Sequence, residues 1–191
     1  MHKTILILFT SLFLFSCEKT AEKNYKALPI ETFLSGGLER GYTLYIPPSA
    51  SKNSPLVFML HGLGSTNTII MNYSQMNQVA DKYGFAVCYP QGIKSSKASI
   101  YTKKGSTFWN VGYDTHKDET VNDIEFITSL AQYLQNEHNF NPEKTFCAGM
   151  SNGGDMSYLL GCQAPDVFKA IAPITGCMMG WIYDSCNQND P

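Results

Sequence analysis

The sequence is short of charge and lacks the clustered cysteines and histidines of a zinc site. Of its 191 residues, 16% are charged and the formal net charge is -2, which gives no electrostatic basis for binding nucleic acid. The six cysteines include no C-x-x-C pair, and none of them clusters with the four histidines at the spacing of a zinc site. We therefore expect a protein with no nucleic-acid partner, no metal and no other cofactor.

The sequence also lacks an apolar run long enough to cross a bilayer. The run over residues 5–15 is almost unbroken, but it has the length of a signal-peptide core. Residues 14–17, Leu-Phe-Ser-Cys, close it and resemble a bacterial lipobox, with cleavage before Cys17 and acylation of its sulfur. The alternative is an ordinary signal peptide followed by an incidental cysteine.

The N-terminal segment is therefore expected to divide into a processed part and a tether. We predict a lipoprotein signal peptide over residues 1–16, and a tether over residues 17–33 that begins with the acylated Cys17. Two or more acyl chains would hold the protein at a membrane surface without a spanning helix. The expected location is the cell envelope, in the periplasm or at the cell surface, or otherwise the secreted fraction.

Apolar runs of strand length alternate with stretches of helical spacing along the rest of the chain. A composition that is 43% hydrophobic and 13% aromatic is enough for the core of one domain. Thr120 is predicted to cap the helix that follows it. The alternation indicates an α/β fold with a mostly parallel sheet, helices on both faces, and an active site at the carboxyl ends of the strands. The predicted strands cover residues 42–46, 56–60, 85–89, 145–148 and 170–174, and the helical stretches lie around residues 76–83, 120–134 and 156–160.

Residues 149–153, Gly-Met-Ser-Asn-Gly, stand between a predicted strand and a predicted helix. In that context the G-x-S-x-G pattern is typical of a nucleophile elbow, in which a serine is held on a very tight turn. Such a turn crowds its neighbours, so Gly149 and Gly153 must lack a Cβ atom. Amides at the start of the helix can also stabilise a developing oxyanion. The alternative is a glycine-rich turn that leads into an ordinary helix.

Six landmarks in a fixed order resemble one group of enzymes. Each motif is modest alone, but the order and spacing make the set specific. From about residue 34 to the end, the chain resembles the secreted α/β-hydrolases of the polyhydroxybutyrate depolymerase, feruloyl esterase and acetyl xylan esterase group. The resemblance implies an α/β-hydrolase domain over residues 34–191. The landmarks are Gly36-Gly37 with Arg40 and residues 42–47, then residues 60–62, 89–92, 121–127, 149–154 and 168–176.

The resemblance assigns roles to particular residues. It implies that Ser151 is the nucleophile and that the backbone amides of Leu63 and Asn152 form the oxyanion hole. It also places His61 in the oxyanion loop and not in the role of general base.

The cysteines allow more than one pairing. The residues alone leave Cys162, Cys177 and Cys186 open as candidates for a disulfide, whereas Cys88 and Cys147 lie in apolar strands and are expected to be buried thiols. The resemblance implies the pair Cys162–Cys186.

The group's order of catalytic residues is serine, acid, histidine, but no histidine follows Ser151 in this sequence. We expect the later aspartates to be a helix-surface residue, a turn residue and loop residues, and not the acid of a triad. The resemblance therefore predicts an incomplete hydrolase domain that lacks its last strands. Because a serine without an adjacent base is a poor nucleophile, the 191-residue chain alone is expected to be almost inactive. The aspartates concerned are Asp155, Asp166, Asp184 and Asp190.

Two aromatic residues have two interpretations each. Residues 93–119 show no clear periodicity and are expected to form a long loop that carries Trp109. Trp109 and Tyr89 are candidates to line an aromatic substrate subsite, as phenolic esters would need. The alternative is that both are anchors of the core or the loop.

The sequence leads to three functional hypotheses. The first is an exported, lipid-anchored serine carboxylic ester hydrolase acting on polyester oligomers or acylated polysaccharide, with the lipid anchor linking it to a membrane. The second is a non-catalytic surface lipoprotein with a degenerate hydrolase fold that binds carbohydrate or ester ligands. The third is a peptidase or thioesterase on the same fold, which fold alone does not exclude.

Overall fold

The computed structural model describes residues 28–97, 103–184 and 186. The predicted signal peptide and Cys17 lie outside the described residues. Within the described part of the chain, the helices are all too short or too polar to traverse a bilayer.

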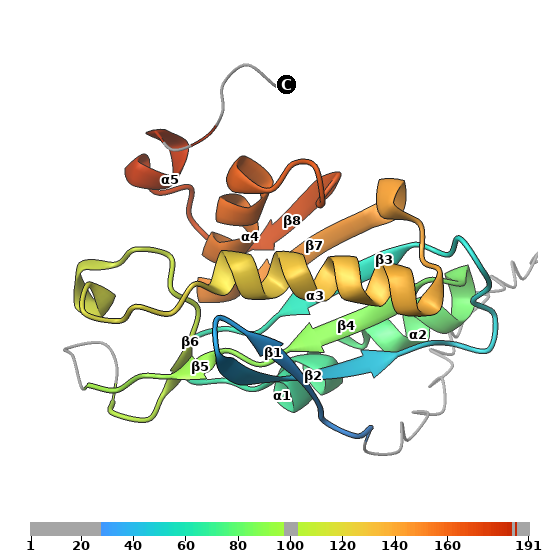
Figure 1. The fold of residues 1–191 in the computed structure, drawn as a ribbon, viewed down its shortest axis with the longest axis horizontal. Helices are drawn as coiled ribbons and strands as arrows, with labels where there is room; N and C mark the ends of the chain where they lie inside the picture. Colours follow the sequence, from blue (N-terminus) through green and yellow to red (C-terminus); the bar gives the residue numbers. More distant parts are fainter. Residues whose placement is uncertain (1–27, 98–102, 185, 187–191) are drawn as a thin grey trace, which may run out of the picture.

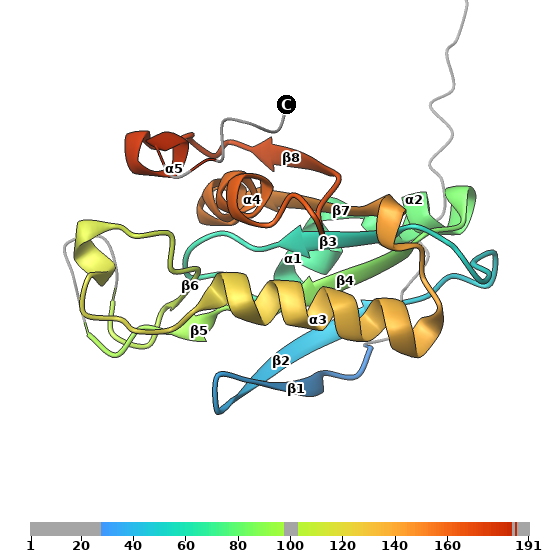
Figure 2. The same ribbon diagram turned by 45° about the horizontal axis from the view of Figure 1, so that its top comes forward.

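A six-stranded sheet forms the centre of the molecule, with the strand order β1-β2-β4-β3-β7-β8. The β1–β2 hairpin and the β2–β4 pair are antiparallel, whereas β4, β3, β7 and β8 run parallel. Figures 1 and 2 show the sheet running from the hairpin at the bottom to β8 at the top. The strands are β1 (Glu31–Ser35), β2 (Leu38–Tyr45), β3 (Leu56–Leu60), β4 (Ala86–Pro90), β7 (Thr145–Met150) and β8 (Ala170–Ile174).

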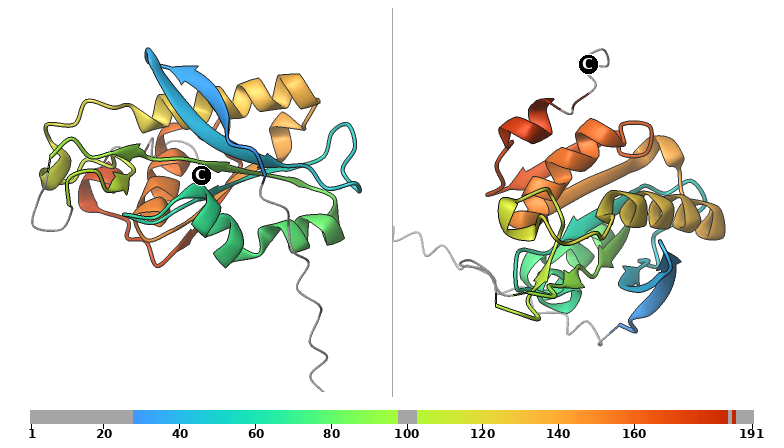
Figure 3. Two further views of the ribbon diagram at one scale, coloured as in Figure 1. Left: turned by 90° about the horizontal axis from the view of Figure 1, so that it is seen from below. Right: turned by 60° about the vertical axis from the view of Figure 1, so that its left-hand side comes forward.

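Helices cover both faces of this sheet. In Figure 3, α1 and α2 lie on the opposite side of the sheet from α3. The larger core lies beneath α3 and α4, and the smaller one beneath α1 and α2. The prediction of an α/β fold with a mostly parallel sheet and helices on both faces is confirmed. The helices are α1 (Asn67–Ser74), α2 (Met76–Tyr83), α3 (Asp123–His138), α4 (Asn152–Gln163) and α5 (Gly180–Asp184).

The segment predicted as a long loop contains a little regular structure. A two-stranded sheet pairs β5 (Ile93–Lys94) with β6 (Thr107–Phe108), and a 3-10 turn, η1, covers Asp114–His116. A second 3-10 turn, η2 (Pro142–Lys144), leads into β7. The short β6 strand places the residues after it directly beside the carboxyl ends of the central strands.

The start of α3 differs from the prediction. The capping residue is Asn122 and not Thr120, because the Asn122 side chain accepts a hydrogen bond from the amide of Glu125. Asp123, in the first turn, is buried and forms an ion pair with Arg40 of β2, with 2.5 Å between Arg40 Nη2 and Asp123 Oδ1. Its other carboxylate oxygen accepts a hydrogen bond from the amide of Asn110 at 2.7 Å. Burial nevertheless raises the pKa of Asp123, against the opposing effect of the Arg40 charge.

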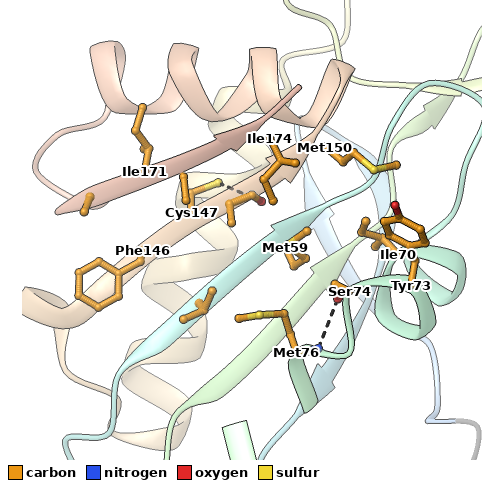
Figure 4. A pocket seen from close by; sticks show the side chains of 14 residues that line it. Met59, Ile70, Tyr73, Ser74, Met76, Phe146, Cys147, Met150, Ile171 and Ile174 are labelled. Atoms are coloured by element: carbon orange, nitrogen blue, oxygen red, sulfur yellow. Dashed lines mark hydrogen bonds between the residues drawn. The ribbon is translucent and has the colours of Figure 1, made fainter. Parts of the chain in front are cut away.

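On the face that carries α1, part of the sheet is not covered by any described helix (Figure 3). β8 is an edge strand, and its residues alternate between exposed and half-buried. Beside it, on the same face as α1, lies a groove of about 490 Å³ lined almost entirely by apolar side chains. Figure 4 shows Met59, Met150 and Ile174 around this groove, with Tyr73 at the α1 side. We call it the apolar groove.

Candidate active site

Ser151 is the single residue between the end of β7 and the start of α4. Its backbone has φ 53° and ψ -121°, a conformation that residues other than glycine rarely adopt. Two hydrogen bonds hold it there: its amide donates to the carbonyl of Ile174 at 2.8 Å, and its carbonyl accepts from the amide of Asp155 at 2.9 Å. The residue is exposed. The serine is thus presented to solvent on a strained turn whose geometry its neighbours fix.

The two glycines of the pattern are required by the close packing of this turn. A Cβ atom on Gly149 would lie 2.2 Å from the carbonyl oxygen of Gly153. A Cβ atom on Gly153 would lie 2.6 Å from the carbonyl oxygens of both Leu60 and His61. These are backbone atoms that a side chain cannot push aside, so the crowding expected of a nucleophile elbow is present at both positions.

The loop that leaves β3 passes directly beside the elbow. β3 and β7 are parallel neighbours, with Leu60 opposite Gly149, so the chain emerges at the same edge of the sheet. A Cβ atom on Gly62 would lie 3.3 Å from the carbonyl oxygen of Met150 and 3.5 Å from the Cβ of Ser151. Within the described residues, the amides of Leu63 and Asn152 donate to no hydrogen-bond partner. Among the described residues, neither N–H group is therefore already engaged by a partner.

The His61 side chain stabilises the loop after β3 through its own hydrogen bonds. Its ring is fully buried, with Nδ1 2.8 Å from the carbonyl oxygen of Gly62 and Nε2 accepting from the amide of Gly92 at 2.9 Å. Those two contacts require the neutral ring with the proton on Nδ1. Burial lowers the pKa of His61 to about 4. Since neither nitrogen faces Ser151, the ring is a structural part of the loop and is not placed as a base.

The two aromatic candidates for a substrate subsite are fully buried. The Trp109 indole N–H donates to the carbonyl of His61 at 2.8 Å, and its ring packs against the His61 ring with 4.9 Å between centroids. The Tyr89 hydroxyl donates to the Asn77 side chain at 2.7 Å. Neither ring reaches the surface, so the structure favours the interpretation of both as anchors over that of substrate-lining residues.

The Asn152 side chain has a role that sequence reasoning missed. Its carbonyl oxygen accepts from the Trp109 amide at 2.8 Å, and its amide nitrogen donates to the Trp109 carbonyl at 3.1 Å. The side chain is buried. No pattern in the sequence points to this contact, because Trp109 and Asn152 are 43 positions apart. The one available signal is that the elbow contains an asparagine, whose side chain has both a donor and an acceptor and so can hydrogen-bond to another segment.

Asp155 was expected on the surface of the helix, and that expectation is wrong. Its side chain is only 5% exposed and accepts hydrogen bonds from the Tyr113 hydroxyl and from the amide of Cys177, the latter at 2.7 Å. Burial, together with the neighbouring carboxylate, raises the pKa of Tyr113. Asp155 thereby joins the start of α4 to the loops before α3 and after β8, which explains why a charged residue is buried there.

The described cysteines are either joined in a disulfide or free. Cys162, at the end of α4, is joined to Cys186 by a disulfide, the pair that the resemblance implies. Cys88 and Cys147 are buried free thiols, and burial raises the pKa of Cys147 to about 12. Cys177 is free and exposed. The disulfide fastens the segment after α5 to the helix that carries the elbow.

A general base for Ser151 does not stand beside it in the part of the chain that the structure describes. None of the described histidines, His61, His116 and His138, shares a hydrogen bond with Ser151. Among the described residues, no group of three or more His, Cys, Asp and Glu side chains is arranged to hold a metal ion. Among the described residues, the site therefore combines an exposed serine with two amides that donate to no partner, and no histidine is bonded to the serine.

Comparison with known proteins finds esterases among those similar in sequence. The chain is 26% identical over 147 residues to acetylxylan esterase A of Talaromyces purpureogenus, which covers 77% of this chain and 36% of that protein. It is 28% identical over 138 residues to feruloyl esterase B of Thermothelomyces thermophilus, covering 72% of this chain and 44% of that protein. The chain thus spans less than half of the length of either relative.

A solved structure shows the same fold. The acetyl xylan esterase from Aspergillus awamori superposes with a TM-score of 0.56 at 18% identity, covering 75% of this chain and 50% of that one. The sequence model described as esterase PHB depolymerase matches residues 40–190, well over half of the chain. The chain therefore belongs to the PHB depolymerase esterase family and has an α/β-hydrolase fold.

Proposed function

We propose that this chain carries the nucleophile and the oxyanion hole of a serine carboxylic ester hydrolase. The observation that carries the proposal is Ser151, exposed on its strained turn beside the unpaired amides of Asn152 and Leu63. Membership of an esterase family supports the same reaction class.

The reaction would proceed through an acyl-enzyme. The Ser151 oxygen attacks the acyl carbon, its proton passes to a base, and the carbonyl oxygen becomes an oxyanion that accepts hydrogen bonds from the amides of Asn152 and Leu63. The carbon–oxygen bond to the alcohol then breaks and the alcohol leaves with a proton. Water attacks the acyl-enzyme by the same route and releases the carboxylic acid. Losing one fixed backbone donor would cost about 3 kcal/mol of transition-state stabilisation.

The proposed substrates are esters of polymers. The relatives are named for acetylated xylan and for feruloyl esters, and the family for polyhydroxybutyrate. We therefore propose polyester oligomers or acylated polysaccharide as the substrate class. A thioester or peptide substrate on the same fold stays an alternative, because a fold does not define the leaving group.

The proton acceptor is proposed to come from outside the described residues. The chain spans 36% and 44% of two relatives' lengths, and the described histidines do not bond to Ser151. A serine site without its base keeps only a small part of its rate. We therefore expect the 191-residue chain by itself to turn over esters very slowly while Ser151 remains chemically accessible.

Fluorophosphonate labelling tests the nucleophile directly. Because no base assists Ser151 among the described residues, the purified chain is expected to form a covalent adduct slowly, over a long incubation at high probe concentration. The adduct should lie on the peptide that contains Ser151, and the Ser151→Ala variant is expected to form none. Mass spectrometry of the digested protein identifies the modified residue. Labelling that persists in Ser151→Ala would contradict the assignment of the nucleophile.

The same experiment separates the enzyme from a second candidate function. The lack of a base bonded to Ser151 among the described residues favours a non-catalytic surface protein that binds carbohydrate or ester ligands on a degenerate site. That function predicts no labelling of the wild-type chain, together with measurable binding of acetylated xylan oligomers. The close packing at Gly149 and Gly153 supports the catalytic alternative, because a site that only binds has no need of a strained serine.

Export and lipid anchoring belong to the same proposal. The apolar run over residues 5–15 and the Leu-Phe-Ser-Cys sequence that ends at Cys17 support a lipid-modified N-terminus outside the cytoplasm. Expressed in a bacterial host, the wild-type chain should appear in the membrane fraction with a diacylglyceryl mass on Cys17. Cys17→Ser should move it to the soluble fraction. An unmodified Cys17 in the mature protein would contradict the anchor.

A further inference from the structure

The two proposed oxyanion donors come from different elements. The Asn152 amide belongs to the first turn of α4, whereas the Leu63 amide belongs to the loop after β3. An oxyanion hole works because its donors are fixed at the correct spacing before charge develops. Something must therefore hold the loop at a set distance from the helix.

Trp109 bonds to both sides of this pair. Its indole N–H donates to the carbonyl of His61, two residues before Leu63. Its backbone amide and carbonyl both bond to the Asn152 side chain, at 2.8 and 3.1 Å. Trp109 and the Asn152 side chain are both buried, so these hydrogen bonds are shielded from water. Among the described residues, Trp109 is the one that hydrogen-bonds to both His61 and Asn152.

The residues just before Trp109 hold the far end of the same loop. The amide of Gly64 donates to the carbonyl of Thr107 at 2.7 Å, and the Thr107 hydroxyl donates to the carbonyl of Ser65. The oxyanion loop is thus held at both of its ends by residues 107–109. The Asn152 side chain in turn hydrogen-bonds to the Trp109 backbone. It therefore connects the oxyanion loop, through residues 107–109, to the start of α4.

We propose that Trp109 and the Asn152 side chain form a positioning pair that sets the spacing between the Leu63 and Asn152 amides. This inference rests on the proposed function. Both side chains act through the amides and do not touch the substrate, so they are positioning residues and not catalytic ones. Asn152 then has two separate tasks, one for its backbone N–H and one for its side chain.

An equilibrium probe of the oxyanion hole tests the pair without a general base. Phenylboronic acid bonds through boron to a serine oxygen, the serine proton passes to solvent, and the tetrahedral boronate that results carries a negative charge. Two variants weaken the pair to different extents. Asn152→Ala removes both hydrogen bonds to the Trp109 backbone but keeps the Asn152 amide, and Trp109→Phe removes only the indole donor to His61.

The expected result is a graded loss of boronate affinity. Removing a donor altogether lowers rates by two to three orders of magnitude, so misplacing one should weaken binding on the order of tenfold for Asn152→Ala and less for Trp109→Phe. Asn77→Ala is the matched control, because Asn77 is equally buried and bonds to the Tyr89 hydroxyl away from the elbow. It should lower the melting temperature without changing boronate affinity. Ser151→Ala should bind no boronate covalently.

The outcomes separate this inference from the proposed function. If the wild-type chain binds boronate and is labelled by fluorophosphonate, but both variants bind boronate as tightly as wild type, the positioning pair is wrong and the proposed nucleophile stands. A second outcome is that Asn77→Ala and Asn152→Ala both lose boronate affinity in proportion to their loss of stability. The effect is then general destabilisation, and the proposed positioning pair is wrong. If wild type shows neither boronate binding nor labelling that depends on Ser151, the proposed function fails and the inference fails with it.

Discussion

At the scale of single residues, His61 shows how a buried ring can limit stability at low pH. Burial lowers its pKa to about 4, whereas a histidine in the unfolded chain has a pKa near 6.5. Between those values the unfolded state binds more protons than the folded state, so the free energy of unfolding falls as the pH falls. The complete loss in the free energy of unfolding from this ring is about 3 kcal/mol. Above about pH 6.5 the contribution is fully retained.

The prediction is a loss of stability between about pH 6.5 and pH 4 that depends on His61. Urea unfolding of wild type and His61→Gln across that range measures it. The variant should be less stable at neutral pH, because it loses two buried hydrogen bonds, but its stability should change less with pH. His116, whose pKa is also lowered by burial, contributes in the same direction, and His116→Gln is the matched comparison. Equal pH dependence in wild type and His61→Gln would exclude the ring as the cause.

Some residues of the site could be predicted from the sequence, and others could not. Gly149 and Gly153 could be, because a backbone that must pass another backbone at close range admits one residue type. Asp155 could not be, because its partners at Tyr113 and Cys177 come from segments whose positions depend on the complete fold. A local pattern reports the conformation of its own turn but not the distant groups that a side chain meets.

At the scale of elements, the central strands were the most predictable part. β3 and β4 are almost wholly buried parallel strands, and β7 is buried on one face and half-buried on the other, so all three appear in the sequence as largely apolar runs. The β5–β6 pair was not predicted, since strands of two residues carry no periodicity. The cap of α3 was misplaced by two residues because both Thr120 and Asn122 are suitable capping residues, and the burial of Asp123 against Arg40 selects the second.

The segment that holds the oxyanion loop in place is also the one with the weakest pattern in the sequence. Residues 107–109 lie within a stretch where no period is visible, yet they hold both ends of the oxyanion loop. Loops position functional groups through individual hydrogen bonds, which leave no periodic trace. The elbow could therefore be recognised from its motif, whereas the support that holds its partner loop had to be seen in the structure.

At the scale of the whole molecule, the apolar groove beside β8 has consequences for behaviour in solution. Its lining is almost wholly apolar and, within the described part of the chain, the outer edge of β8 is unpaired, a combination that favours association with other apolar surfaces. The relatives are more than twice as long as the part that this chain matches. In isolation, the chain should therefore bind a hydrophobic dye at neutral pH and should self-associate as its concentration rises.

A pair of exposed tyrosines allows this prediction to be tested at the groove itself. Tyr73 is 72% exposed and lines the groove, whereas Tyr83 is 65% exposed and does not. Tyr73→Glu places a charge at the rim of the apolar groove, so it should reduce dye fluorescence and shift sedimentation toward the monomer. Tyr83→Glu adds the same charge elsewhere and should leave both measurements close to wild type. If the two variants behave alike, net charge and not the groove governs association, because the added charge is identical and only its position differs.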